Sequence, residues 1–388
     1  MQDSLQVTPR EHFHGSDLEK IEKIYGIKKE EIVSFSANVN PLGLSKKLKS
    51  SLIDHIDVLS SYPDREYTEL RKTIGAYCRT SPGHIIVGNG STELISLMIQ
   101  LKKSKRAMIF GPSYSEYERE ISLCGGTSRY FRLREEDGFN PNIQKLEEAL
   151  NDNIDLLVIC NPNNPTSTCI KRGQMREILD ICKALGIFVM IDETYIEFVE
   201  DMESSDAVPL TQYYSNLYVI RGISKFFAAP GLRLGYAITG NEDLIRQINT
   251  VKDPWTINSL AEEAGKLMFT DREYIEESRE LIFSERRRIC ERLKMLREKG
   301  LKYYEPSANF VLCHLENSGI DADLLFDDCI REKMMIRNCS TFPFLDNSYF
   351  RFCFMRPEDN DRLLERIEKT LTDPDLSYST IQWQTTEL

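Results

Sequence analysis

The sequence predicts an α/β protein, with a mostly parallel sheet between layers of helices and a second, smaller α+β part. Between residues 45 and 258, short apolar runs such as LLVIC (156–160) and FVMID (188–192) alternate with helix-like segments. Continuous apolar strands separated by helices are typical of parallel sheets that are buried on both faces. At 388 residues, the chain is long enough for both parts.

The elements are predicted in order from their periodicity and end signals. Residues 17–26 carry apolar residues at helical spacing between a cap-like Asp17 and Gly26, which predicts a short helix. Further helices are expected at 46–56, 66–78, 92–101, 115–121, 176–186, 261–300, 321–335 and 357–371. Strands of the first part are expected at 85–87, 107–110, 156–160, 188–192 and 217–220.

We expect four segments along the chain. The composition changes after Pro254 and Trp255, which places one boundary near residue 258. The segments are an N-terminal arm that joins the small domain (1–44), a large domain (45–258), a small C-terminal domain (259–375) and a polar tail (376–388).

Composition and charge exclude several classes of function. A net charge of −12 without a basic block argues against nucleic-acid binding. No run of about 18 apolar residues occurs, so we expect no membrane span. Ten cysteines without a CxxC pair and five histidines without ligand-like spacing argue against a metal site. Reduced cysteines and a polar N-terminus without a signal-peptide pattern predict a cytoplasmic protein.

Three polar residues follow the ends of predicted strands: Asn164, Asp192 and Lys225. Ligands of α/β sheets bind at the carboxyl ends of the strands, so we expect these side chains to converge. A lysine in apolar surroundings has a lowered pKa, and its amine can act as a nucleophile. Arg233, between Gly231 and Gly235, suits the binding of a dianion. Taken alone, the lysine and arginine are better explained as surface residues beside a turn, and the rest of the chain decides between the two interpretations.

A glycine-rich turn joins the strand at 85–87 to the next helix. Its sequence, GNGST (88–92), allows close backbone approach, and the first helical amides and two hydroxyls can hold a phosphate. A purely structural turn of this composition is an equal alternative. Together with the lysine, the arginine, a buried carboxylate, an asparagine and an aromatic residue, the turn completes the set that pyridoxal 5'-phosphate (PLP) requires.

Four motifs resemble the fold-type-I PLP enzymes, in the branch of histidinol-phosphate aminotransferases and threonine-phosphate decarboxylases. They are NPNNPT (161–166), DETY (192–195), SK (224–225) and GLRLGY (231–236). The resemblance implies the type I PLP-dependent transferase fold, with a large PLP-binding domain. It implies that Lys225 forms the Schiff base and that Asp192 pairs with the pyridinium nitrogen. The other implied cofactor contacts are Asn164 and Tyr195 to the ring oxygen, Tyr114 stacked on the ring, and Gly90, Ser91, Thr92, Ser224 and Arg233 at the phosphate.

The resemblance also implies a homodimer with shared active sites. Tyr62, in SYPD (61–64), is similar to the tyrosine that reaches the cofactor phosphate from the neighbouring subunit. One position departs from the family pattern, because Gly222 stands where many relatives have a phosphate-binding hydroxyl. The predicted phosphate cradle therefore has one hydroxyl fewer.

Arg337 and Arg351 are the candidates for binding substrate. Arg351 alternates with phenylalanines in a strand-like run and would be costly to bury without an anion. By resemblance, Arg351 binds the substrate carboxylate, and Arg337, His14 and the backbone near Asn40 bind a substrate phosphate. Both arginines and His14 could instead be solvated surface residues.

Several segments resemble the threonine-phosphate decarboxylases of cobalamin biosynthesis more than the aminotransferases. They are HGSD (14–17), FSANVNPLG (35–43), KFFAAPGLRLGY (225–236), PWTIN (254–258) and the spacing of RNCSTF and YFRF. Tyr195 is instead similar to the aminotransferase pattern, and HGSD departs from the decarboxylase HGGN-like form.

The resemblance implies decarboxylation of L-threonine O-3-phosphate, or of a close phosphorylated amino acid such as serine phosphate, in cobamide biosynthesis. The alternative is a PLP-dependent aminotransferase of the histidinol-phosphate type. A non-catalytic sensor of this fold is a third class, but such proteins carry a DNA-binding module for which this acidic chain has no evident segment.

Overall fold

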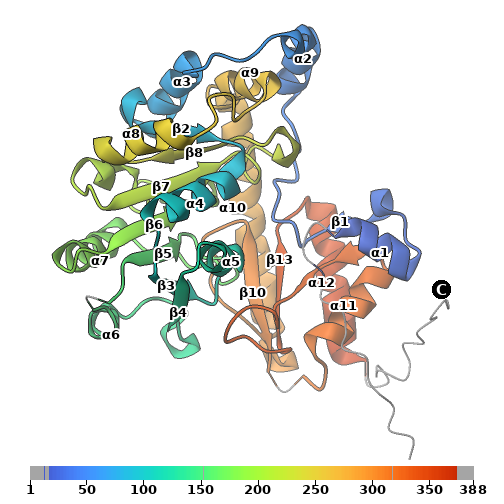
Figure 1. The fold of residues 1–388 in the computed structure, drawn as a ribbon. Coiled ribbons are helices and arrows are strands. Elements are labelled where there is room, and N and C mark those ends of the chain that lie inside the picture. The colour runs from blue at the N-terminus through green and yellow to red at the C-terminus, as the bar shows by residue number, and fades with distance from the viewer. Residues whose placement is uncertain (1–12, 14–16, 152, 317, 374–388) are drawn as a thin grey trace, which may run out of the picture.

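The computed structural model describes residue 13 and residues 17–151, 153–316 and 318–373. Within this part of the chain two lobes lie side by side (Figure 1). The large lobe is a seven-stranded sheet with the helices that pack on it, and the small lobe contains a four-stranded sheet.

The sheet of the large lobe has the strand order β2-β8-β7-β6-β5-β3-β4. Only the β2–β8 and β7–β8 pairs are antiparallel, so β8 runs against the six other strands. The strands are β2 (Ile85–Gly88), β3 (Arg106–Gly111), β4 (Thr127–Arg132), β5 (Leu156–Cys160), β6 (Phe188–Asp192), β7 (Leu217–Gly222) and β8 (Gly235–Ile238). This arrangement confirms the predicted mostly parallel α/β sheet.

Helices cover both faces of this sheet, because both faces of its strands are apolar. On β5, Leu156 and Val158 face one hydrophobic core, while Leu157 and Ile159 face another. The first core lies under α4 (Gly90–Lys102), α5 (Glu116–Leu123) and α8 (Glu242–Val251). The second core lies under α6 (Ile143–Ala149) and α7 (Arg172–Ala184), and it continues into the small lobe.

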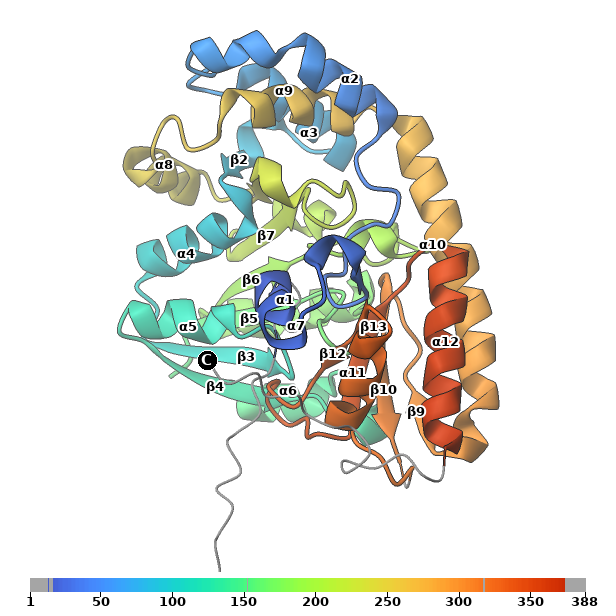
Figure 2. The same cartoon turned by 90° about the vertical axis from the view of Figure 1, so that its right-hand side faces the viewer.

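Three helices pack together at the β2 side of the large lobe. They are α2 (Lys46–Asp54), α3 (Thr68–Cys78) and α9 (Ser259–Met268). Helix α9 begins just after the boundary that the sequence predicts near residue 258, yet it packs on α2 and α3 of the large lobe. The long α10 (Arg272–Met295) then runs to the small lobe, where it lies beside α12 (Figure 2).

The small lobe is built on an antiparallel sheet of order β12-β13-β10-β9. Its elements are β9 (Leu301–Tyr303), β10 (Phe310–Leu315), α11 (Ala322–Arg331), β12 (Arg337–Asn338), β13 (Tyr349–Cys353) and α12 (Pro357–Thr372). The N-terminal β1 (Val33–Ser34) pairs in parallel with β11 (Met334–Met335), and α1 (Leu18–Tyr25) lies beside it (Figure 1). Residues from the start and the end of the chain therefore meet in this lobe.

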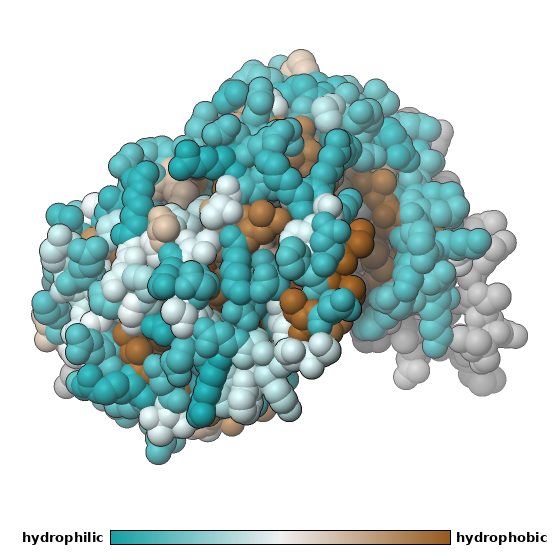
Figure 3. All heavy atoms as spheres, turned by 90° about the horizontal axis from the view of Figure 1, so that it is seen from above, coloured by the Kyte–Doolittle hydropathy of each residue, from teal (hydrophilic) through white to brown (hydrophobic). Residues whose placement is uncertain are grey.

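The face of the molecule seen from above is mainly hydrophilic, and hydrophobic residues show through in separate patches (Figure 3). Among the described residues, no helix is both long and apolar enough to cross a membrane.

Candidate active site

A cavity of about 530 Å³ is lined by residues of both lobes. It lies at the carboxyl ends of the parallel strands, where α/β proteins bind their ligands. The structure brings together most of the side chains that the sequence predicts for the site. Those lining the cavity are Gly90, Ser91, Thr92, Tyr114, Asn164, Asp192, Tyr195, Ser224, Lys225, Arg233, Arg337 and Arg351.

Lys225 follows the end of β7 by three residues, and its amine is buried in the cavity wall. Its Nζ donates a hydrogen bond of 2.7 Å to the carbonyl oxygen of Ala37. Burial, assisted by the positive charge of Arg351, lowers the pKa of Lys225 to about 8. A substantial fraction of the amine is therefore uncharged at neutral to mildly alkaline pH, as a lysine nucleophile requires.

Three glycines lie side by side across the strand ends beneath the first turn of α4. In the ladder, Gly235 pairs with Gly88 on one side and with Gly222 on the other. A Cβ on Gly235 would lie 2.6 Å from the backbone nitrogen of Ser91, so the helix approaches this closely only because Gly235 has no side chain. The first amides of α4 and the Ser91 and Thr92 hydroxyls therefore face the cavity.

Arg233 adds a positive charge to this turn. Its Nη2 donates to the carbonyl of Asn89 at 3.3 Å, and its Nη1 donates to that of Pro230 at 3.2 Å. A Cβ on Gly90, which has a φ of +80°, would lie only 2.2 Å from Arg233 Nη2. A Cβ on Gly222 would lie 3.8 Å from Ser91 Cβ, so a side chain could be placed at this position without a clash. The turn and the arginine together fit a phosphate group.

Asp192 is the last residue of β6 and is 5% exposed. Its Oδ1 accepts hydrogen bonds from the backbone amide of Thr194 at 3.0 Å and from the Thr194 hydroxyl at 2.5 Å. Its Oδ2 accepts from the hydroxyl of Tyr117 at 2.7 Å. Burial raises the pKa of Asp192, and these donors oppose the increase. The sequence reasoning missed Tyr117, which lies in the first turn of α5, three residues after Tyr114. That spacing is the feature of the sequence that could have indicated it.

Asn164, Tyr195 and Tyr114 complete the predicted set of cofactor contacts. Asn164 Oδ1 accepts a hydrogen bond from Arg351 Nη1. The Tyr195 hydroxyl accepts one of 3.3 Å from Asn38 Nδ2, which the sequence reasoning also missed. Tyr114 lines the cavity and meets Tyr117 edge to face at 5.7 Å between ring centroids.

Arg337 and Arg351 are direct cross-strand neighbours in the β12–β13 ladder. Both are buried, with exposed fractions of 8% and 4%. Arg351 Nη2 donates to the carbonyl of Ser36 at 2.7 Å, and Arg337 Nη2 donates to the Thr341 hydroxyl at 2.9 Å. Neither guanidinium forms an ion pair with a carboxylate of the described residues. Two adjacent buried cations that pair with no carboxylate of the described residues would favour an anionic ligand between them.

Two of the predicted residues that the structure describes, Asn40 and Tyr62, do not line this cavity. Asn40 is turned away from it, because its Nδ2 donates to the carbonyl of Phe226 at 2.8 Å and to the hydroxyl of Ser278 at 2.7 Å. The resemblance places the backbone near Asn40 at the substrate phosphate, and residues 36–39 beside it line the cavity. Tyr62 is 80% exposed and packs on Trp255 at 4.9 Å between ring centroids. His14 lies outside the described residues.

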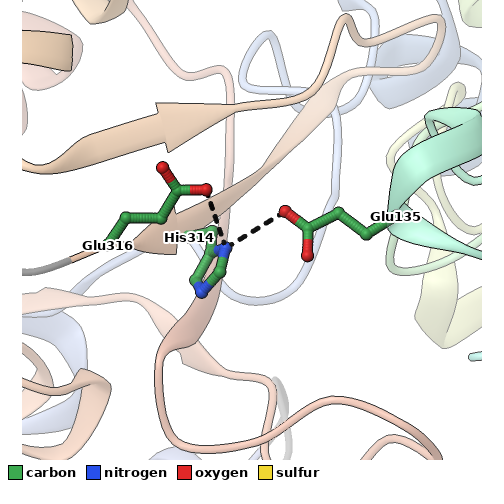
Figure 4. Close-up of side chains that lie close together, drawn as sticks. All are labelled: Glu135, His314 and Glu316. Atoms are coloured by element: carbon green, nitrogen blue, oxygen red, sulfur yellow. Dashed lines mark hydrogen bonds and ion pairs between the residues drawn. The ribbon is translucent and has the colours of Figure 1, made fainter.

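A second cluster of titratable groups, Glu135, His314 and Glu316, lies at the lobe boundary (Figure 4). The Lys302 ammonium already contacts both carboxylates, at 2.6 Å from Glu135 and 3.3 Å from Glu316. The Tyr349 hydroxyl also donates to Glu135 at 2.8 Å. Arg297 also pairs with Glu316 at 2.6 Å, so two cations balance the two carboxylates and the cluster is an interlobe ion-pair network.

The donor set fits PLP: a buried lysine amine, a helix N-terminus with an arginine for a phosphate, and a buried carboxylate for a pyridinium nitrogen. Fold and site thus define the class of fold-type-I PLP-dependent enzymes. Residues 30–367 match the family described as aminotransferase class I and II, and the chain belongs to this family. The protein is therefore an enzyme, and PLP is its cofactor.

The proteins similar to this chain include threonine-phosphate decarboxylases and histidinol-phosphate aminotransferases. A threonine-phosphate decarboxylase of Salmonella typhimurium is 32% identical over 359 residues, which are 92% of this chain and 96% of that protein. The structure of the histidinol-phosphate aminotransferase from Clostridium acetobutylicum aligns with a TM-score of 0.80 at 34% identity, over 87% of this chain and 98% of that one. The Sinorhizobium meliloti histidinol-phosphate aminotransferase, solved with pyridoxal-5'-phosphate, aligns with a TM-score of 0.78 at 18% identity, over 91% and 94% of the two chains.

Proposed function

We propose that this enzyme decarboxylates L-threonine O-3-phosphate, or a close phosphorylated amino acid such as serine phosphate, in cobamide biosynthesis. The observation that carries the proposal is the pair of adjacent, buried guanidinium groups of Arg337 and Arg351 beside Lys225. A substrate with a carboxylate and a phosphate on neighbouring carbons offers two anions at a matching short spacing. The relative from Salmonella supports the same reading over nearly its whole length.

The proposed roles of the chain's residues follow from their places. Lys225 holds the cofactor covalently, and Asp192 faces its pyridine nitrogen. The remaining cofactor contacts are Asn164 and Tyr195 at the ring oxygen, Tyr114 on the ring face, and Gly90, Ser91, Thr92, Ser224 and Arg233 at the phosphate. When bound, PLP withdraws electrons from a bond at the substrate Cα.

Substrate orientation then selects the bond that breaks. Arg351 binds the carboxylate, and its Nη1 is tied to Asn164, so the carboxylate is held at a fixed place relative to the cofactor ring. Arg337 binds the phosphate, assisted by the Thr341 hydroxyl beside it. His14 is proposed as a further phosphate contact by family resemblance alone.

The second candidate is an aminotransferase of the histidinol-phosphate type. The observation that favours it is Tyr195, which follows the aminotransferase pattern and lies in the cavity wall beside Asn38. The related structure from Clostridium acetobutylicum carries that activity. Both candidates use the same cofactor site, but they differ in the substrate that is bound and in the bond at its Cα that breaks.

The deciding experiment supplies purified holoenzyme with L-threonine O-3-phosphate and no keto acid. Stoichiometric release of CO₂ and of a phosphorylated amino alcohol supports the decarboxylase. Turnover of histidinol phosphate that requires 2-oxoglutarate, without CO₂ release from threonine phosphate, would instead establish the aminotransferase. A Lys225→Ala variant is the control for non-enzymatic loss of CO₂.

We also propose that the enzyme is a homodimer with shared active sites. Exposed apolar side chains gather around Tyr62, including Leu59, which is 56% exposed, and Trp255, which is 44% exposed. Such a patch suits burial against a second copy. Mixing a Tyr62→Ala variant with a Lys225→Ala variant should restore activity through hybrid dimers. Failure of that complementation, with both variants folded, argues against shared sites.

A cytoplasmic location is proposed as well. All ten cysteines lie in the described residues, and none is in a disulfide. Unpaired cysteines in this number fit a reducing compartment.

A further inference from the structure

The carboxylate of Asp192 depends on hydrogen bonds alone for its stabilisation. It forms no ion pair with a cation of the described residues. Its three donors are the amide and hydroxyl of Thr194 on Oδ1 and the hydroxyl of Tyr117 on Oδ2. Thr194 is two residues away in sequence, whereas Tyr117, in α5, is 75 residues away.

The surroundings of Tyr117 make it a dependable donor. The side chain is 1% exposed and packs in the core under α4 and α5. Burial, reinforced by the charge of Asp192, raises the pKa of Tyr117 well above its ordinary value, so the hydroxyl keeps its proton. Its ring also meets Tyr114 edge to face, which fixes the direction of the hydroxyl.

We propose that Tyr117 is a positioning residue that fixes the orientation of Asp192 and, through it, keeps the pyridine nitrogen of the bound cofactor protonated. The inference rests on the proposed role of Asp192 at that nitrogen, and it is independent of which reaction follows. Tyr117 is not itself assigned to the cofactor or the substrate.

The physical argument concerns how a proton is shared between the ring nitrogen and Asp192. Each hydrogen bond to the ionised carboxylate favours the charged pair, with the proton on nitrogen. The other titratable groups that face Asp192 are Tyr114, Cys160 and Tyr195, and burial raises the pKa of each, so they contribute no opposing charge at neutral pH. Loss of the Tyr117 hydroxyl therefore makes the carboxylate more basic and moves the proton toward it.

The test follows the cofactor nitrogen directly. Holoenzyme is loaded with PLP that carries ¹⁵N in the pyridine ring, and the ¹⁵N chemical shift at pH 7.5 measures how far the nitrogen is protonated. Because a hydrogen bond to a charged group is worth about 1.5–3 kcal/mol, Tyr117→Phe should shift the proton-sharing constant about tenfold or more away from nitrogen. Affinity for PLP should fall by a similar factor.

Three further variants make the outcome specific. Asp192→Asn should abolish the pyridinium signal, and adding Tyr117→Phe to Asp192→Asn should change it no further. Tyr130→Phe is the matched control. The Tyr130 hydroxyl, from β4, donates at 2.8 Å to the exposed carboxylate of Glu118, which lies in α5 next to Tyr117. Its ¹⁵N shift should equal that of the wild type.

The results separate the two ideas. If Asp192→Asn moves the ¹⁵N shift and Tyr117→Phe does not, the role of Tyr117 is overturned while that of Asp192 stands. If Asp192→Asn leaves the shift unchanged, the proposed role of Asp192 fails. Should Tyr117→Phe not fold, 4-aminophenylalanine at position 117 provides a weaker donor of similar shape, and the shift should move away from the pyridinium. An unchanged shift there also overturns the inference.

Discussion

Replacing Arg337 with alanine should remove recognition of the substrate phosphate and leave the cofactor site intact. The Arg337 guanidinium is 8% exposed, lies over the Phe342 ring at 5.5 Å and donates to the Thr341 hydroxyl. Burial lowers its pKa, assisted by the charge of Arg351, yet leaves it a cation at neutral pH. A phosphate bound there is thus paired with a desolvated charge.

The size of the effect follows from that burial. Removing one partner of a buried, hydrogen-bonded charge pair costs about 3–5 kcal/mol, which corresponds to a loss of roughly 10²–10³·⁵ in kcat/KM. Arg337→Lys keeps the charge but loses the planar fork. This variant should lose about 1.5–3 kcal/mol of transition-state stabilisation, which corresponds to a roughly tenfold to hundredfold reduction in kcat/KM for the phosphorylated substrate.

The assay compares two substrates that differ only in the phosphate. Binding of L-threonine O-3-phosphate and of L-threonine is measured from the absorbance change of the bound cofactor, and CO₂ release is measured for both. Arg337→Ala should lower kcat/KM for L-threonine O-3-phosphate by the factor given above. The kcat/KM for L-threonine should stay almost unchanged. Arg292→Gln is the control, because its ion pairs to Asp361 and Glu368 are long, at 3.8 Å, and it does not line the cavity.

An equal loss for both substrates would refute this reasoning. It would mean that Arg337 acts on the carboxylate or on the fold rather than on the phosphate. A loss of PLP affinity in Arg337→Ala would also contradict the separation of the two anion sites.

Three further predictions concern the cofactor site and the lobe boundary. The rate at which apoenzyme forms its covalent bond with PLP should rise with pH and level off above about pH 8, because only the neutral amine of Lys225 reacts. A rate that does not change with pH would contradict the lowered pKa of Lys225. Gly90→Ala should weaken PLP binding about tenfold or more in equilibrium titrations, because the new Cβ displaces Arg233 from the phosphate turn; unchanged affinity would show that the turn yields. Burial alone would raise the pKa of Glu135, but hydrogen bonds from Lys302, Tyr304 and Tyr349 lower it from 4.5 to about 2. Its stabilising contribution is complete above pH 4.5 and is lost as pH falls toward 2, so Glu135→Gln should lower the melting temperature at pH 7 and approach the wild type near pH 3 in calorimetry; an equal difference at both pH values contradicts the ion-pair role.

The sequence predicted the fold class and the cofactor because both depend on local patterns. Apolar runs such as 188–192 form strands wherever both faces of the sheet are buried. A polar residue that ends such a run must then lie at the carboxyl end of the strand. For this reason Asp192 and Lys225, although 33 residues apart in the sequence, could be placed in one site. The GNGST segment (88–92) likewise predicted a glycine-rich turn with close backbone approach, and the structure adds that Gly90 has a φ of +80° there.

Contacts between distant segments were beyond this reasoning. Tyr117 reads as one more apolar residue of an amphipathic helix, and only the packing of α5 over β6 brings its hydroxyl to Asp192. The family resemblance concerned the backbone near Asn40, and only the structure shows that the side-chain amide of Asn40 contacts α10 through Ser278.

The sequence by itself determined the chemistry of this protein: a lysine, a carboxylate and a phosphate turn in the order and spacing of a PLP enzyme. The tertiary structure decided which groups act as pairs. Arg337 and Arg351 become neighbours through antiparallel pairing of β12 and β13, and Ser36 reaches Arg351 from the other end of the chain. The physical reason is that strand and helix periodicity depend on residues that are close in the sequence. A pair of desolvated charges, in contrast, forms only when segments that are remote in the sequence pack together and exclude water.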